Sequence, residues 1–160
     1  MKKNTLLLFG AMLMAMTFVQ TTNAQSNKEE TEFMQSIFGM EKKAIVAEFL
    51  KIDSTNPFWV LYDEYETKRK ELGKNRIDVL TDYVENYDKL TDAKYDEVYA
   101  GMISLRKSND KLVDTYYKKI KKASGPKIAA QFFQLENYFL SEIRSAVMEE
   151  IPYIGEFDKK

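Results

Sequence analysis

Apolar residues recur every three or four positions along most of this 160-residue chain, which is the period of an α-helix. The pattern predicts four helices, at about 29–52, 57–89, 92–123 and 126–151. No segment alternates apolar and polar residues over the length of a strand. The sequence therefore predicts an all-α fold with a single helical domain at 25–160.

Capping and turn residues separate the predicted helices. Asn56 and Thr91 are good N-caps because their side chains can accept hydrogen bonds from free backbone amides, and Pro57 suits a first helical position. The link before the third helix is short, so the second and third helices are expected to be antiparallel neighbours, each roughly 50 Å long. The expected architecture is an elongated four-helix arrangement built on a long antiparallel helical hairpin.

The apolar positions of each helix predict which face is buried. In the first helix they form a stripe at the following positions: Phe33, Ile37, Met40, Ala44, Ala47 and Leu50. Three charged residues lie on the stripes of other helices, with Arg69 and Arg76 seven positions apart on the second and Glu136 on the fourth. We expect a candidate buried polar cluster of Arg69, Arg76 and Glu136, because arginine can pair with a carboxylate in bidentate geometry. The alternatives are an anion-binding notch, a register-setting ion cluster, and arginines whose heads reach solvent.

The first 24 residues have the composition of a secretory signal peptide. Lys2 and Lys3 precede an apolar run, and the small-residue site Thr22-Asn23-Ala24 precedes Gln25. We expect cleavage after Ala24, a mature chain of 25–160 and a periplasmic or secreted location. No later segment is apolar enough to predict stable membrane insertion.

Composition excludes much chemistry. The chain contains no His and no Cys, which excludes zinc-hydrolase, thiol-nucleophile and Ser-His-Asp mechanisms. No Gly-rich phosphate loop and no calcium-loop motif occurs, so no metal or cofactor is expected and the protein is not expected to be an enzyme. Without Lys2 and Lys3, 22 basic residues face 25 acidic ones, a net charge of −3 that predicts no affinity for nucleic acid.

Tyrosine is abundant, with ten residues in the chain. Tyrosine combines apolar area with a hydroxyl that tolerates water, so it suits a surface that contacts other proteins. Tyr99 and Tyr117 lie beside the best apolar stripe of the third helix and are the candidate polypeptide-binding aromatics. The alternative is that these rings border an ordinary bundle core.

The chain resembles the Spy/CpxP (LTXXQ) group of small periplasmic proteins. The resemblance rests on the signal peptide, the helical hairpin and the segment Leu90-Thr91-Asp92-Ala93-Lys94, which matches the first two motif positions and has Lys94 in place of Gln. The chain is also similar to exported helical proteins of Bacteroidetes that share Phe-Trp-x-x-Tyr-x-x-Tyr, here Phe58 to Tyr65, and Gln-Phe-Phe-Gln-Leu-Glu-Asn, here Gln131 to Asn137.

The resemblance to the Spy/CpxP group implies ATP-independent chaperoning or restraint of an envelope stress sensor. We therefore expect a non-enzymatic exported protein that binds other polypeptides, as an envelope-stress chaperone. One alternative is a structural or regulatory adaptor that docks one envelope partner, and another is a small-ligand binder that uses Arg69, Arg76 and Glu136. A homodimer is an open alternative for the oligomeric state.

Overall fold

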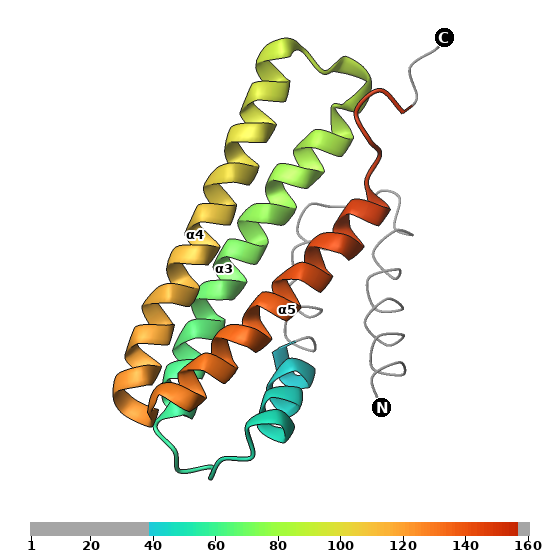
Figure 1. Cartoon of the computed structure of the whole chain (residues 1–160). Helices are drawn as coiled ribbons and strands as arrows, with labels where there is room; N and C mark the ends of the chain where they lie inside the picture. Colours follow the sequence, from blue (N-terminus) through green and yellow to red (C-terminus); the bar gives the residue numbers. More distant parts are fainter. Residues whose placement is uncertain (1–38, 157–160) are drawn as a thin grey trace.

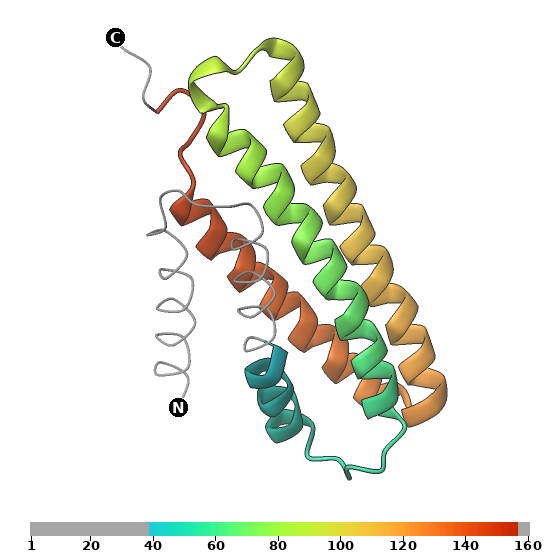
Figure 2. The same cartoon turned by 180° about the vertical axis from the view of Figure 1, so that it is seen from behind.

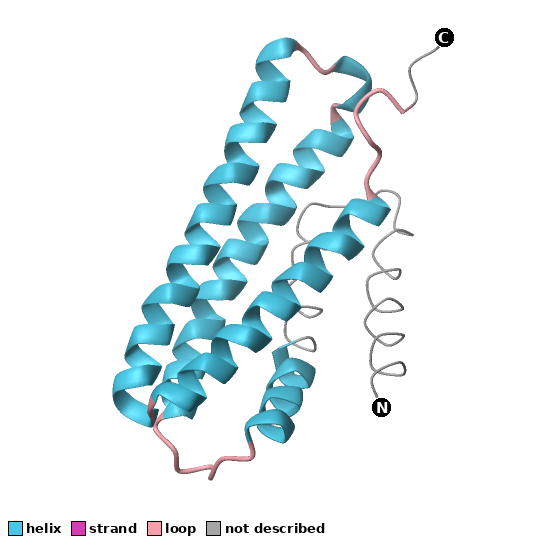
Figure 3. Cartoon of the chain, viewed as in Figure 1, coloured by secondary structure: helices cyan, strands magenta, loops and turns pink. Residues whose placement is uncertain are grey.

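The computed structural model describes residues 39–156 of the chain. In this part, every regular element is a helix (Figure 3). Residues 39–50 are helical, and the elements that follow are α3 (Phe58–Glu85), the 3-10 helix η2 (Tyr87–Lys89), α4 (Asp92–Ser124) and α5 (Pro126–Glu150). The all-α fold class is confirmed, and the observed helix ends agree with the expected ones to within about a turn.

Two expected features lie outside the described residues. These are the signal peptide at 1–24 and the beginning of the first helix at 29–38.

The long hairpin consists of α3 and α4, which lie side by side and antiparallel (Figures 1 and 2). The chain reverses again at Gly125, and α5 packs beside α4. The helical segment 39–50 lies near the same end of the molecule as the α4–α5 turn (Figure 1). The described chain is therefore elongated, with four helical segments at one end and fewer at the other.

The predicted cap at Thr91 is confirmed, whereas the N-cap of α3 is Pro57 and not the predicted Asn56. The Thr91 side chain accepts a hydrogen bond from the amide of Lys94 at 3.4 Å, as expected of an N-cap. The Asn56 Oδ1 atom accepts from the amide of Phe58 at 3.0 Å, and α3 begins at Phe58, one residue later than the sequence predicts.

The core lies at the end where segment 39–50, the start of α3, the end of α4 and the start of α5 meet. It is rich in aromatic rings whose centroids lie 5.0–6.4 Å apart, many of them edge to face, the geometry that aromatic pairs favour. The buried members of the cluster are Val46, Leu50, Phe58, Tyr62, Tyr65, Val113, Tyr116, Ile120, Ala129, Phe132, Leu135, Phe139 and Leu140.

The predicted stripe of the first helix is wrong at three of its four described positions, whereas Leu50 is buried as predicted. Met40 is 65% exposed, and Ala44 and Ala47 are also exposed. The buried face carries Lys42 and Val46. The helix is therefore rotated relative to the prediction, because the charge of Lys42 is matched inside the bundle.

Candidate functional site

Lys42 is at the centre of a buried ion network that joins three elements. Its side chain comes from segment 39–50 and is 0% exposed. Its Nζ atom donates to Oε1 of Glu66 on α3 and to Oε2 of Glu136 on α5, both at 2.7 Å. Lys42 thus links the two carboxylates across the bundle.

Three aromatic rings enclose the same ammonium group. The Lys42 Nζ atom lies 5.1 Å from the ring centroid of Phe139, 5.4 Å from that of Tyr65 and 5.8 Å from that of Tyr62. An ammonium held over aromatic faces is attracted by their negative π surfaces, an attraction that is strongest when water is excluded. The rings therefore replace part of the hydration that burial removes.

Arg69 and Tyr65 complete the network. The Arg69 Nε atom donates to both carboxylate oxygens of Glu66 at 3.0 Å, and its Nη2 atom lies 3.0 Å from Oε2. The Tyr65 hydroxyl donates to Oε2 of Glu136 at 2.6 Å. Two cations and two carboxylates therefore balance, which is the condition under which charges are tolerated in a core.

The electrostatics follow from this balance. Burial by itself raises the pKa of Glu66, but the charges of Lys42 and Arg69 outweigh it, so this pKa lies below its ordinary value. Burial tends to lower the pKa of Arg69, and the Glu66 carboxylate more than compensates. Burial, and then the charge of Glu136, raise the pKa of Tyr65 well above its ordinary value. Glu66 and Arg69 therefore stay ionised, with Tyr65 as a neutral donor.

The structure places two of the three predicted cluster residues in this network. Arg69 and Glu136 are both buried in it, but the described hydrogen-bond partners of Glu136 are Lys42 and Tyr65. Arg76 is half-buried farther along α3, where burial and then the charge of Arg144 lower its pKa. Arg69 and Glu136 therefore lie in one network, where the charge of Glu136 helps to raise the pKa of Arg69, whereas Arg76 lies apart from it.

Sequence analysis missed Lys42 and Glu66. Glu66 follows Tyr65 directly, and it lies three residues before Arg69, a helical spacing at which opposite charges meet. That spacing could have indicated the pair. No comparable local signal exists for Lys42, whose partners are 24 and 94 residues away.

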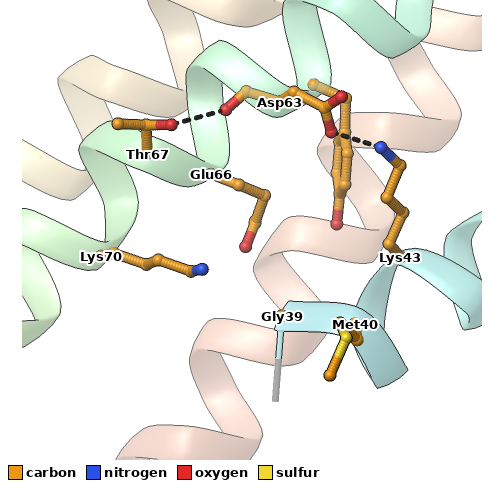
Figure 4. Close-up of a pocket in the computed structure, with 8 residues that line it drawn as sticks. Gly39, Met40, Lys43, Asp63, Glu66, Thr67 and Lys70 are labelled. Carbon is orange, nitrogen blue, oxygen red and sulfur yellow. Dashed lines mark hydrogen bonds and ion pairs between the residues drawn. The ribbon is translucent and has the colours of Figure 1, made fainter. Parts of the chain in front are cut away.

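A cavity of about 270 Å³ lies between segment 39–50 and α3, beside the network (Figure 4). Lys43 and Asp63 form an ion pair at its edge at 2.5 Å, and Glu66 and Lys70 extend toward Gly39. Its walls are formed by Gly39, Met40, Lys43, Tyr62, Asp63, Glu66, Thr67 and Lys70. The cavity thus presents charges of both signs to a small molecule.

One buried polar atom of this wall has no hydrogen-bond partner among residues 39–156. The Tyr62 side chain is 0% exposed, and its hydroxyl has no hydrogen bond within the described chain. Burial, and then the charges of Glu66 and Glu136, raise the pKa of this hydroxyl far above its ordinary value. Tyr62 is therefore a neutral, buried group whose hydroxyl makes no hydrogen bond within the described chain.

The two candidate binding aromatics lie at different places on α4. Tyr99 is 68% exposed near the beginning of the helix. Tyr117 is half-buried, packs against the core cluster and contacts the ring of Phe133 at 6.2 Å between centroids. Eighteen helical residues separate them by about 27 Å. Tyr99 therefore belongs to the hairpin end and Tyr117 to the edge of the core.

The hairpin end carries several other exposed apolar residues. Tyr95 lies on the same face of α4 as Tyr99, four residues earlier. Val84 near the end of α3 is 45% exposed, and Tyr153 and Ile154 after α5 are 61% and 65% exposed. This end, comprising Tyr83, Val84, Tyr87, Tyr95, Tyr99, Tyr153 and Ile154, is called the tyrosine tip below.

Within residues 39–156, no helix is both long and apolar enough to cross a membrane, and no cluster of three or more acidic side chains has the geometry to hold a metal ion. Fold and site together define an all-α helical bundle with a buried, balanced ion network. Comparison of the chain with protein-family models, with curated proteins and with solved structures found no match.

Proposed function

We propose that the protein is a non-enzymatic exported protein that binds other polypeptides through the tyrosine tip. The supporting observation is that exposed tyrosine and aliphatic side chains gather at the end of the molecule farthest from the core cluster. Gathered apolar side chains on a surface indicate a contact site, and tyrosine is enriched among residues that carry binding energy.

The chemistry of the tip favours weak and unselective contacts. Tyr99 and Tyr153 present rings and hydroxyls to solvent, so they can contact apolar side chains and backbone polar groups alike. Such a surface suits unfolded client chains, as in a chaperone of the Spy/CpxP type. The proposed location is the periplasm or the extracellular medium, because of the signal peptide predicted at 1–24.

The test compares two exposed tyrosines. Tyr99→Ser should weaken binding of a permanently unfolded, carboxymethylated protein roughly tenfold, or about 1.4 kcal/mol, a loss that only a minority of interface residues cause on truncation. Tyr138→Ser is the matched control, because Tyr138 is 46% exposed on α5 and lies outside the tip. Isothermal titration measures both affinities, and melting temperatures check the folds. Equal affinity of Tyr99→Ser and the wild type would refute the proposed surface.

The adaptor alternative predicts a different result. Cross-linking in an envelope extract would then give one dominant partner, and the purified protein would bind no unfolded client.

The cavity beside Tyr62 favours a second candidate function, the binding of a small zwitterion. The Lys70 ammonium can hold a carboxylate, the acidic groups of the wall can hold an ammonium, and the Tyr62 hydroxyl is unpartnered within the described chain. Ligand binding raises the melting temperature. A panel of amino acids at millimolar concentration tests this, and the absence of any shift would exclude the candidate.

A further inference from the structure

The residues that follow α5 form a tail that returns to the tyrosine tip. Pro152–Glu156 lies against the end of α3 and η2 (Figure 1). The Tyr83 hydroxyl donates to the carbonyl oxygen of Pro152 at 2.7 Å, and the Tyr87 hydroxyl donates to that of Tyr153 at 2.5 Å. The Tyr87 oxygen also accepts a hydrogen bond from the amide of Glu156 at 2.9 Å.

All three bonds use the main chain of the tail. Tyr153 and Ile154 are exposed to solvent, at 61% and 65%. Tyr83 is 4% exposed, and its ring packs edge to face against the ring of Tyr87 with 5.8 Å between centroids. Through these three bonds, Tyr83 and Tyr87 therefore contact the backbone of the tail and not its side chains.

The tail is preorganised for this contact. The Glu156 amide donates to the carbonyl oxygen of Tyr153 at 3.0 Å, and Gly155 has φ 80°, the arrangement of a type II turn with glycine at its third position. The Tyr153 amide donates to the Glu156 carboxylate at 2.8 Å. A tethered segment also has an effective concentration in the millimolar range, which suffices to compete with weak ligands.

From these contacts we infer that Tyr83 and Tyr87 form a backbone-binding subsite for client polypeptides, and that the tail Pro152–Glu156 occupies it as a competing internal ligand. The inference rests on the proposed polypeptide-binding function and adds its mode and its regulation. Folded proteins have most of their buried carbonyl groups already paired, so a subsite that binds free carbonyls selects unfolded chains. A client must displace the tail to reach it.

The test uses a variant of the full chain in which the tail binds more weakly while Tyr83 and Tyr87 are unchanged. Glu156→Pro removes the amide that bonds the Tyr87 oxygen and closes the turn. Binding of a carboxymethylated unfolded protein, followed by fluorescence anisotropy, should tighten about three- to tenfold. Glu149→Gln is the control, because it removes one negative charge from the exposed end of α5, leaves the tail amides intact and should not change affinity.

A second variant shows where the gain originates. Tyr87→Phe added to Glu156→Pro removes one hydroxyl and keeps the ring, so it should cancel the gain. Unchanged or weaker binding by Glu156→Pro, while Tyr99→Ser still weakens the wild type, would overturn the competing tail and leave the proposed function standing. If the double variant Glu156→Pro with Tyr87→Phe still binds the client more tightly than the wild type, the backbone-binding subsite would be overturned. No client binding by any variant would refute the proposed function itself.

Discussion

At the scale of single residues, Lys42 has the largest consequence for this molecule. It brings a positive charge into a core that also holds two glutamates and an arginine. Removing water from these groups costs several kcal/mol for each ion, and their mutual pairing offsets that cost only while the charges balance. The network therefore specifies how segment 39–50, α3 and α5 fit together more than it adds net stability.

The first prediction is a double-mutant cycle on the network. Lys42→Met leaves two carboxylates with one guanidinium, and Glu136→Leu leaves two cations with one carboxylate, so each change should cost about 3–5 kcal/mol of unfolding free energy. The double variant keeps the neutral Glu66–Arg69 pair. It should therefore be more stable than either single variant, as urea unfolding will measure.

The control for this cycle is the exposed ion pair between Lys43 and Asp63, whose side chains are 45% and 58% exposed. Lys43→Met should cost under ~0.5 kcal/mol, because solvent screens such pairs. Additive losses in the double variant would contradict the balanced network.

The second prediction concerns acid. The pKa of Glu66 is lowered from an ordinary value of 4.5, because Lys42 and Arg69 outweigh the opposing effect of burial. Its contribution to stability is therefore fully present above about pH 4.5 and is lost as the pH falls toward the folded-state pKa. Urea unfolding from neutral pH down to about pH 3 should show this loss, and Glu66→Gln should flatten it. If the unfolding free energy depends on pH equally in the wild type and in Glu66→Gln, the loss of stability in acid does not come from Glu66.

At the scale of elements, the turns divide the chain with very few residues. A single residue, Gly125, separates α4 from α5, with φ 91° and ψ 164°. This region of backbone space is essentially restricted to glycine. The Gly125 amide donates to Lys121 and its carbonyl accepts from Ala129, so the turn also caps both helices.

The third prediction contrasts two glycines. Gly125→Ala should lower the unfolding free energy by about 1–3 kcal/mol, because alanine is strained at this φ although no atom obstructs its Cβ. Gly101 lies inside α4, where an added Cβ would make ordinary contact with Val79 at 3.4 Å. Gly101→Ala should raise stability by about 0.5–1 kcal/mol through helix propensity. Thermal melts measure both changes in stability. A loss in both variants, or a gain in both, would contradict the contrast between the two glycines.

The helices themselves follow from local chemistry, but their orientation about their own axes does not. The Thr91 cap was predictable because it depends on neighbours within a few residues. The first helix carries two overlapping faces of helical period, one through Met40 and one through Lys42. Hydrophobicity favours the first, and the distant partners Glu66 and Glu136 select the second.

At the scale of the whole molecule, the core is asymmetric. The buried cluster lies at one end, and much of the hairpin beyond it is half-buried. Regions with few buried apolar contacts open more readily than the core does. The tyrosine tip therefore lies in the part of the molecule that can change its local structure without unfolding the core.

The fourth prediction follows from this asymmetry. Amide hydrogen exchange should be slowest in the core halves of α4 and α5, around Tyr116 and Phe132, and faster near Tyr95 and Tyr99. Mass spectrometry of peptic fragments measures the difference. Uniform protection along α4 would contradict an adaptable tip.

The amino-acid sequence by itself determined the all-α class, the long hairpin, the positions of the turns and the burial of Arg69 and Glu136. These depend on helical period, capping and glycine or proline chemistry, which act over a few residues. Only the tertiary structure decided that Lys42 joins Glu66 and Glu136, that Arg76 lies apart, and that the tail reaches Tyr83 and Tyr87. Those contacts join residues 24 to 94 positions apart, and no local pattern encodes which distant side chains will meet.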